Sequence, residues 1–191
     1  MGKCPNREEA LALLKRYNES DALIKHGMAV ESVMRHYAEK YGEDIEKWGV
    51  TGLLHDLDYE KYPDQHCVKV REILQEEGID EEIIRAVASH GWGICSDLEP
   101  QSLMEKTLYT VDELTGLVNA AVLMRPDKSV MNLEVKSLKK KFKSKSFAAG
   151  VDREIIKKGC EMLNLELSDV MEDVMLGMRA SAEELGLAGE I

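Results

Sequence analysis

Apolar residues recur at the spacing of an α-helix along almost the whole chain, and strand signals are nearly absent. In residues 20–42, for example, one helical face carries Val30, Val33, Met34 and Tyr37. The same pattern predicts helices over residues 5–18, 20–42, 43–56, 65–78, 80–91, 101–124, 152–164 and 168–186. The four prolines all lie outside the helix interiors: Pro5 is the first residue of the first segment, and Pro63, Pro100 and Pro126 fall between segments. We therefore expect an all-α fold of about eight or nine helices.

Length and composition indicate a globular protein with one domain. The chain has 191 residues and a formal net charge of −11, so general affinity for nucleic acid or for an anionic membrane is not expected. No run approaches the ~18–20 apolar residues of a membrane helix, and the first residues do not resemble a signal peptide. The four cysteines form no CxxC pair. These features favour a cytoplasmic protein with reduced thiols.

Polar residues occupy unexpected places in the apolar segments. The run Gly52-Leu53-Leu54 leads directly into His55 and Asp56, and Asp112 lies in the apolar middle of the segment 101–124. A buried carboxylate there costs several kcal/mol unless it is paired or bound to a cation. Further histidines lie at or near the ends of separate expected helices: His26, His66 and His90. These residues are the candidate ligands of a buried ion.

A divalent cation explains this distribution. Imidazole nitrogen and carboxylate oxygen suit iron, manganese, zinc and similar ions. Ligands from several helices of a bundle can converge in its core. Adjacent residues such as His55 and Asp56 point apart on a helix, but at a helix end both side chains can reach one ion.

The ordered pattern H…HD…D resembles the HD-domain superfamily of metal-dependent phosphohydrolases. His26, the pair His55-Asp56 and Asp112 match it within about residues 20–125. The resemblance implies an HD-domain helical bundle whose core spans this region. The matched residues would hold a metal ion.

Dinuclear members of this superfamily carry the longer pattern H…HD…H…H…D, and His66 and His90 occupy its additional positions. The resemblance implies a first ion on the four residues of the shorter pattern and a second on His66 and His90, with Asp56 bridging. Sequence signatures of two groups of relatives are absent. The double histidine and the GYP triplet of HD-GYP phosphodiesterases are missing. The glutamate that nucleotidases of the superfamily carry three residues after the HD aspartate is replaced here by Tyr59. Iron or manganese is favoured, while magnesium, zinc, cobalt and nickel stay open.

Four further features are candidates for the catalytic machinery. Asp58 is the expected base or the residue that orients a histidine. Lys61, Arg125 and the lysine run 136–145 are candidate contacts for a phosphate group. Arg125 can instead cap a helix end, and the lysine run can instead be a solvated helix face.

The remaining polar features are assigned structural roles. Cys67 and Cys95 flank the candidate metal histidines; ordinary packing is expected, and thiolate ligation stays open. His36 lies off the ligand face of its helix, where an exposed side chain is expected. Residues 126–191 form a C-terminal helical extension that packs on the core or pairs with a second chain in a homodimer.

These observations lead to three expected functions. The first is metal-dependent hydrolysis of a small phosphorylated substrate, such as a nucleotide or a related phosphate ester. The second is a diiron oxygenase of the HD type that cleaves a C–C or C–P bond. The third is a non-catalytic module that binds a nucleotide or a partner.

Overall fold

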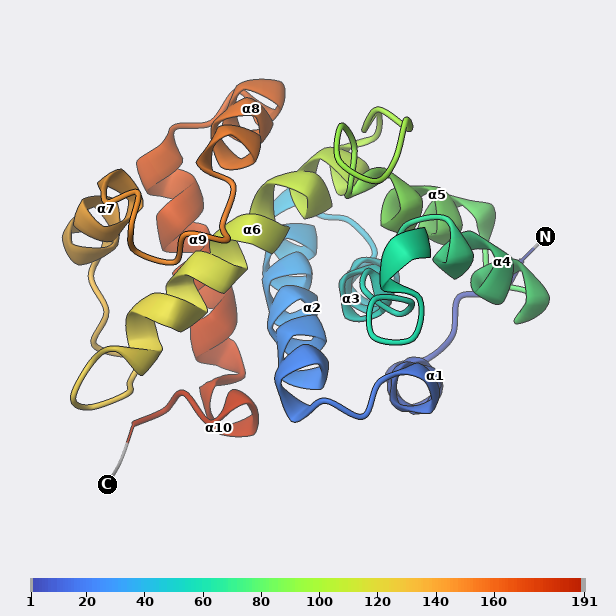
Figure 1. The fold of residues 1–191 in the computed structure, drawn as a ribbon, viewed down its shortest axis with the longest axis horizontal. Helices are drawn as coiled ribbons and strands as arrows, with labels where there is room; N and C mark the ends of the chain where they lie inside the picture. Colours follow the sequence, from blue (N-terminus) through green and yellow to red (C-terminus); the bar gives the residue numbers. More distant parts are fainter. Residues whose placement is uncertain (1, 190–191) are drawn as a thin grey trace.

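The computed structural model describes residues 2–189, which form ten α-helices, one short 3-10 helix and no β-strand (Figure 1). The helices are α1 (Arg7–Tyr17), α2 (Asp21–Tyr41), α3 (Ile45–Leu54), the 3-10 helix η1 (Pro63–Gln65), α4 (Lys69–Glu76), α5 (Glu81–Ser89), α6 (Leu103–Leu123), α7 (Val135–Lys143), α8 (Arg153–Leu163), α9 (Leu167–Ala180) and α10 (Ala182–Leu185). The all-α expectation is confirmed.

Helices α2 and α6 lie at the centre of the molecule. In Figure 1, α7 to α10 lie on one side of this pair, and α1, α3, α4 and α5 lie on the other. Each side has its own cluster of buried apolar side chains, and α2 and α6 contribute mainly to the larger one. The candidate ligands lie where the two halves meet.

Helix α3 packs closely against α2, and a glycine makes this approach possible. A Cβ atom on Gly52 would lie 2.9 Å from the carbonyl oxygen of Val30, so a larger side chain would push the helices apart. Helix α3 then ends at Leu54, with His55 as its C-cap. The close packing brings His55 beside His26 on α2, and their ring centroids are 5.1 Å apart.

The start of α4 differs from the sequence expectation, because this helix begins at Lys69 rather than near residue 65. The reason is a side chain from another segment: Asp58 accepts a hydrogen bond from the backbone N–H of Val70, at 2.8 Å, in the first turn of α4. His66 therefore lies in the turn before the helix.

The two longest helices, α2 and α6, have 21 residues each. Both carry too many polar side chains for a membrane span, and no other helix within residues 2–189 is long and apolar enough to cross a bilayer.

Candidate metal centre

Six candidate ligands converge at the junction of the two halves. They come from the first third of α2, the C-terminal ends of α3 and α5, the turn before α4, and the middle of α6. A cleft of about 360 Å³ opens onto them. Five of the six line this cleft: His26, Asp56, His66, His90 and Asp112. His55 lies behind them and is fully buried.

The first group of ligands consists of His26, His55, Asp56 and Asp112. One donor atom from each residue lies within 4.8 Å of the others. The Nε2 atom of His26 lies 2.9 Å from Oδ1 of Asp112 and 3.7 Å from Oδ2 of Asp56. The Nε2 atom of His55 lies 3.2 Å from each of the same two oxygens.

The second group lies on the other side of Asp56. Both His66 and His90 place Nε2 at 3.4 Å from Oδ1 of this carboxylate. Asp56 thus presents one oxygen to each pair of histidines. A carboxylate in this position can bridge two cations.

Backbone carbonyl groups fix the rings of His55 and His90. Nδ1 of His55 lies 2.7 Å from the carbonyl oxygen of Gly52, and Nδ1 of His90 is bonded in the same way to Val87. A carbonyl oxygen can only accept, so Nδ1 carries the proton in both rings. In the neutral rings, Nε2 keeps its lone pair and faces the carboxylates.

A carboxylate has the same effect on His66. Nδ1 of His66 donates to Oδ1 of Asp58, at 2.7 Å, while Oδ2 of Asp58 accepts a hydrogen bond from the backbone N–H of Val70. Asp58 is fully buried. Its two oxygens therefore fix the His66 ring and the start of α4 together.

The chemistry of these donor atoms fits a divalent cation. Nε2 of His55 is buried and has no hydrogen-bond partner, although it lies 3.2 Å from oxygens of Asp56 and Asp112. A lone pair that faces carboxylate oxygens without a hydrogen bond is unfavourable unless a cation lies between them. Imidazole nitrogen and carboxylate oxygen are suitable ligands for such an ion.

The electrostatic field of the cluster also favours a cation. Burial lowers the pKa of His55, but Asp56 and Asp112 outweigh it and raise this pKa well above its ordinary value. Burial raises the pKa of Asp112, but His55 and His26 lower it far more. The two carboxylates thus favour a positive charge at the ring of His55, and a metal ion can supply that charge in place of a proton. The next residue after Asp112, Glu113, has a pKa raised to about 7, mainly because its side chain is buried and also because Asp112 is negatively charged.

Residues 23–116 match the family model for the HD domain. This part of the chain is an HD domain. The match confirms the resemblance seen in the sequence, and it includes every one of the six candidate ligands. HD domains bind divalent metals, which agrees with the donor set described above.

Curated relatives of this HD protein include two archaeal proteins named tRNA (cytidine(56)-2'-O)-methyltransferase. The one from Picrophilus torridus is 29% identical over 126 residues, which are 59% of this chain and 37% of the relative. The one from Thermoplasma volcanium is 32% identical over 112 residues, which are 54% of this chain and 33% of the relative. The chain thus spans about a third of the length of the curated relatives it matches. No solved structure matches it significantly.

Two cations expected near the phosphate are engaged elsewhere. The ammonium group of Lys61 donates to the carbonyl oxygen of Arg16, at 2.6 Å, and lies over the ring of Tyr17. The guanidinium group of Arg125 forms two hydrogen bonds of 2.8 Å with Asp127 just beyond the end of α6. Neither residue lines the cleft of the HD site.

The lysine run forms α7 and the turn after it. Leu138 and Phe142 are buried beneath the helix, while all its lysines except the half-buried Lys141 are exposed. None of them lines the cleft of the HD site. This is the geometry of a solvated helix face.

A further cation, Lys158, does not line the cleft itself but lies close in the chain to a residue that does. Nζ of Lys158 lies 3.5 Å from the ring centroid of Trp92. Trp92 follows Gly91, and Lys158 lies one turn after Ile155; both Gly91 and Ile155 line the cleft. The contact joins segments 66 residues apart, so helical periodicity gives no signal for it.

The surroundings of His36 also differ from expectation. Its Nε2 lies 3.0 Å from Oδ1 of Asp173, and Lys40 bonds the other oxygen of the same carboxylate at 2.6 Å. His36 is therefore partly buried rather than exposed. It joins α2 to α9, well outside the ligand cluster.

Proposed function

We propose that this chain is a metal-dependent phosphohydrolase that acts on a small phosphate ester. The observation that supports the proposal most directly is that the two oxygens of Asp56 face two different pairs of histidines. Such an arrangement suits two cations that act on one phosphoryl group. The HD domain supports the reaction class.

Each residue has a specific task in this proposal. His26, His55, Asp56 and Asp112 would hold one cation, iron or manganese by preference. His66 and His90 would hold a second cation, with Asp56 shared between the two. Cations bound there would supply hydroxide at neutral pH and stabilise the charge that develops on phosphate.

Asp58 acts as a positioning residue in this proposal, not as a base. Both its oxygens are occupied by His66 and Val70, and it is fully buried, so it has no path to a substrate or a water molecule. It keeps the proton of His66 on Nδ1 and leaves Nε2 free for the metal.

The cleft suits a small anion rather than a large one. Its volume of about 360 Å³ is near the lower end of ligand pockets. Lys158, held over Trp92 near this cleft, is the cation we assign to the phosphate group. Lys61 and Arg125 bond to other parts of the protein and are not used.

The test is hydrolysis of a panel of nucleotides and simple phosphate mono- and diesters, followed as release of inorganic phosphate from the monoesters and nucleotides and as release of the alcohol from the diesters. The protein is loaded with Fe2+ under anaerobic conditions, or with Mn2+, and compared with Asp56→Ala. We expect turnover that needs the metal and is lost in the variant. No turnover by the loaded protein would refute hydrolysis, and oxygen consumption with a substrate would favour the diiron oxygenase instead.

A second candidate function follows from the two relatives named for methylation of a tRNA cytidine. In this alternative the chain is a module that binds RNA. Support comes from α7, which carries exposed lysines on an otherwise acidic protein. Salt-dependent binding of tRNA that is lost in the double variant Lys139→Glu, Lys143→Glu, but kept in Asp56→Ala, would support it. No binding at low salt would exclude it.

A further inference from the structure

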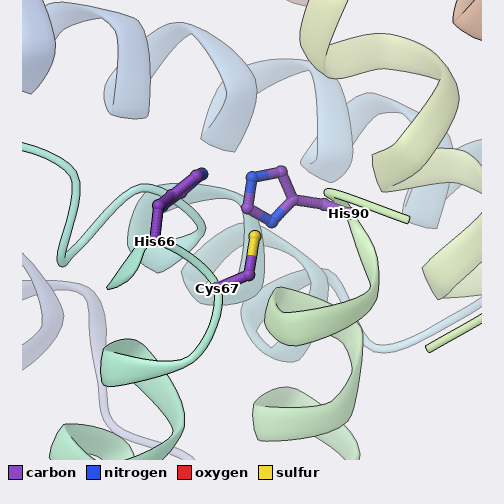
Figure 2. Close-up of side chains that lie close together, drawn as sticks. All are labelled: His66, Cys67 and His90. Carbon is purple, nitrogen blue, oxygen red and sulfur yellow. The ribbon is translucent and has the colours of Figure 1, made fainter. Parts of the chain in front are cut away.

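A cysteine lies against the second pair of histidines. Cys67 follows His66 in the chain, and its side chain is almost completely buried. Figure 2 shows its sulfur pointing toward the ring of His90, with the ring of His66 to one side. One donor atom from each of the three residues lies within 4.8 Å of the others.

The backbone at Cys67 takes a form that brings these neighbours together. Adjacent side chains in regular structure point in different directions, but Cys67 has a φ of 67°, in the left-handed region. Residues other than glycine adopt this conformation rarely, and such residues concentrate at functional sites. Here it turns the sulfur toward the same cluster as His66.

The opposite segment leaves room for the sulfur. A Cβ atom on Gly91 would lie 2.5 Å from Sγ of Cys67 and would also clash with Sγ of Cys95. The two thiols therefore lie close together. A cation bound beside Cys67 would deprotonate its thiol outright.

We propose that Cys67 is a thiolate ligand of the metal held by His66 and His90. Binding releases the thiol proton to solvent, and the sulfur then bonds the cation. A thiolate is a soft ligand, so this position would favour Zn2+, Fe2+ or Co2+ over Mn2+ and Mg2+. The proposal concerns the metal position and holds whichever reaction the chain catalyses.

Cobalt substitution tests this assignment without an activity assay. The protein is freed of metal with a chelator, titrated with Co2+, and compared with Cys67→Ser and with Cys95→Ser as the matched control. A cobalt–thiolate bond gives a charge-transfer band in the near ultraviolet. We expect the band in the wild type and in Cys95→Ser, and its loss in Cys67→Ser. Absence of the band at saturating Co2+, its persistence in Cys67→Ser, or its loss in Cys95→Ser alone would overturn the proposal.

X-ray absorption on the zinc-loaded wild type gives a second test that does not depend on the folding of a variant. We expect a sulfur shell at about 2.3 Å beside the nitrogen and oxygen shell at about 2.0–2.1 Å. A spectrum with only nitrogen and oxygen ligands would overturn the assignment of Cys67.

Discussion

The carboxylate of Asp58 offers a sharp test of how the second metal position is built. Its Oδ1 accepts from Nδ1 of His66 at 2.7 Å, and its Oδ2 accepts from the backbone of Val70 at 2.8 Å. The substitution Asp58→Asn keeps the shape but replaces one acceptor with an NH2 donor. If that NH2 group faces His66, Nδ1 must accept, and the proton moves to Nε2, where it blocks the metal.

The expected magnitude follows from this geometry. Loss of such an outer-shell partner typically weakens metal binding about 10–100-fold, or about 1.4–2.7 kcal/mol. If the amide flips, the NH2 group instead faces the N–H of Val70, and the unsatisfied buried donor destabilises the fold by about 1–3 kcal/mol. One of the two losses is unavoidable, because an amide has a single acceptor oxygen.

Calorimetric titration with Zn2+ and a thermal melt measure these two effects. Asp64→Asn is the matched control, because Asp64 is exposed in the nearby 3-10 helix. We expect the control to behave like the wild type in both measurements. If Asp58→Asn binds its second ion as tightly as the wild type and melts at the same temperature, the assigned role of Asp58 is wrong.

Three further predictions concern stability and substrate binding. Removal of metal with a chelator should lower the melting temperature by about 5–11 °C. This shift corresponds to the ~2.7 kcal/mol of stabilisation by a cation present at a hundred times its dissociation constant. An unchanged melting temperature would argue against a metal in the cluster. Gly177→Ala should lower the free energy of unfolding by about 1–3 kcal/mol in chemical denaturation, because the new Cβ would lie 2.7 Å from the Cα of Val33. Gly150→Ala should lower it far less, because Gly150 has open space around it. Equal effects would contradict the packing of α9 on α2. Lys158→Ala should raise KM for an anionic substrate with little change in kcat. The control Lys157→Ala should change neither constant, because Lys157 pairs with Glu154 at 2.7 Å in solvent. An unchanged KM in Lys158→Ala would show that this lysine does not bind the substrate.

The helical fold and the convergence of His26, His55, Asp56 and Asp112 could be anticipated from the sequence. Helical periodicity is a local signal, and each of these polar residues interrupts or ends an apolar segment. Burial of such groups requires compensation, so their positions in separate helices already implied a common partner. The structure brings their donor atoms within 4.8 Å of one another.

The cations around the cleft could not be anticipated in the same way. Lys61 and Arg125 follow ligands in the sequence, but each bonds to a residue that does not line the cleft. Lys158 reaches the ring of Trp92 only because α8 packs on α6. Such contacts depend on tertiary packing between distant segments, which periodicity does not report.

The geometry of His66 and Cys67 could not be predicted from the sequence for a related reason. The late start of α4 is set by a hydrogen bond from Val70 to Asp58, twelve residues earlier. The left-handed backbone at Cys67 belongs to the same turn. The sequence predicted a helix here, in which these two neighbouring side chains could not meet at one point.

The most direct test of the account is the metal content per chain, measured by elemental mass spectrometry on protein purified without chelator and without added metal. The wild type should hold two ions, and the double variant His66→Ala, His90→Ala should hold one. A wild type that holds no metal, and takes up none on titration with Fe2+, Mn2+ or Zn2+, would contradict the central claim that Asp56 bridges two cation positions.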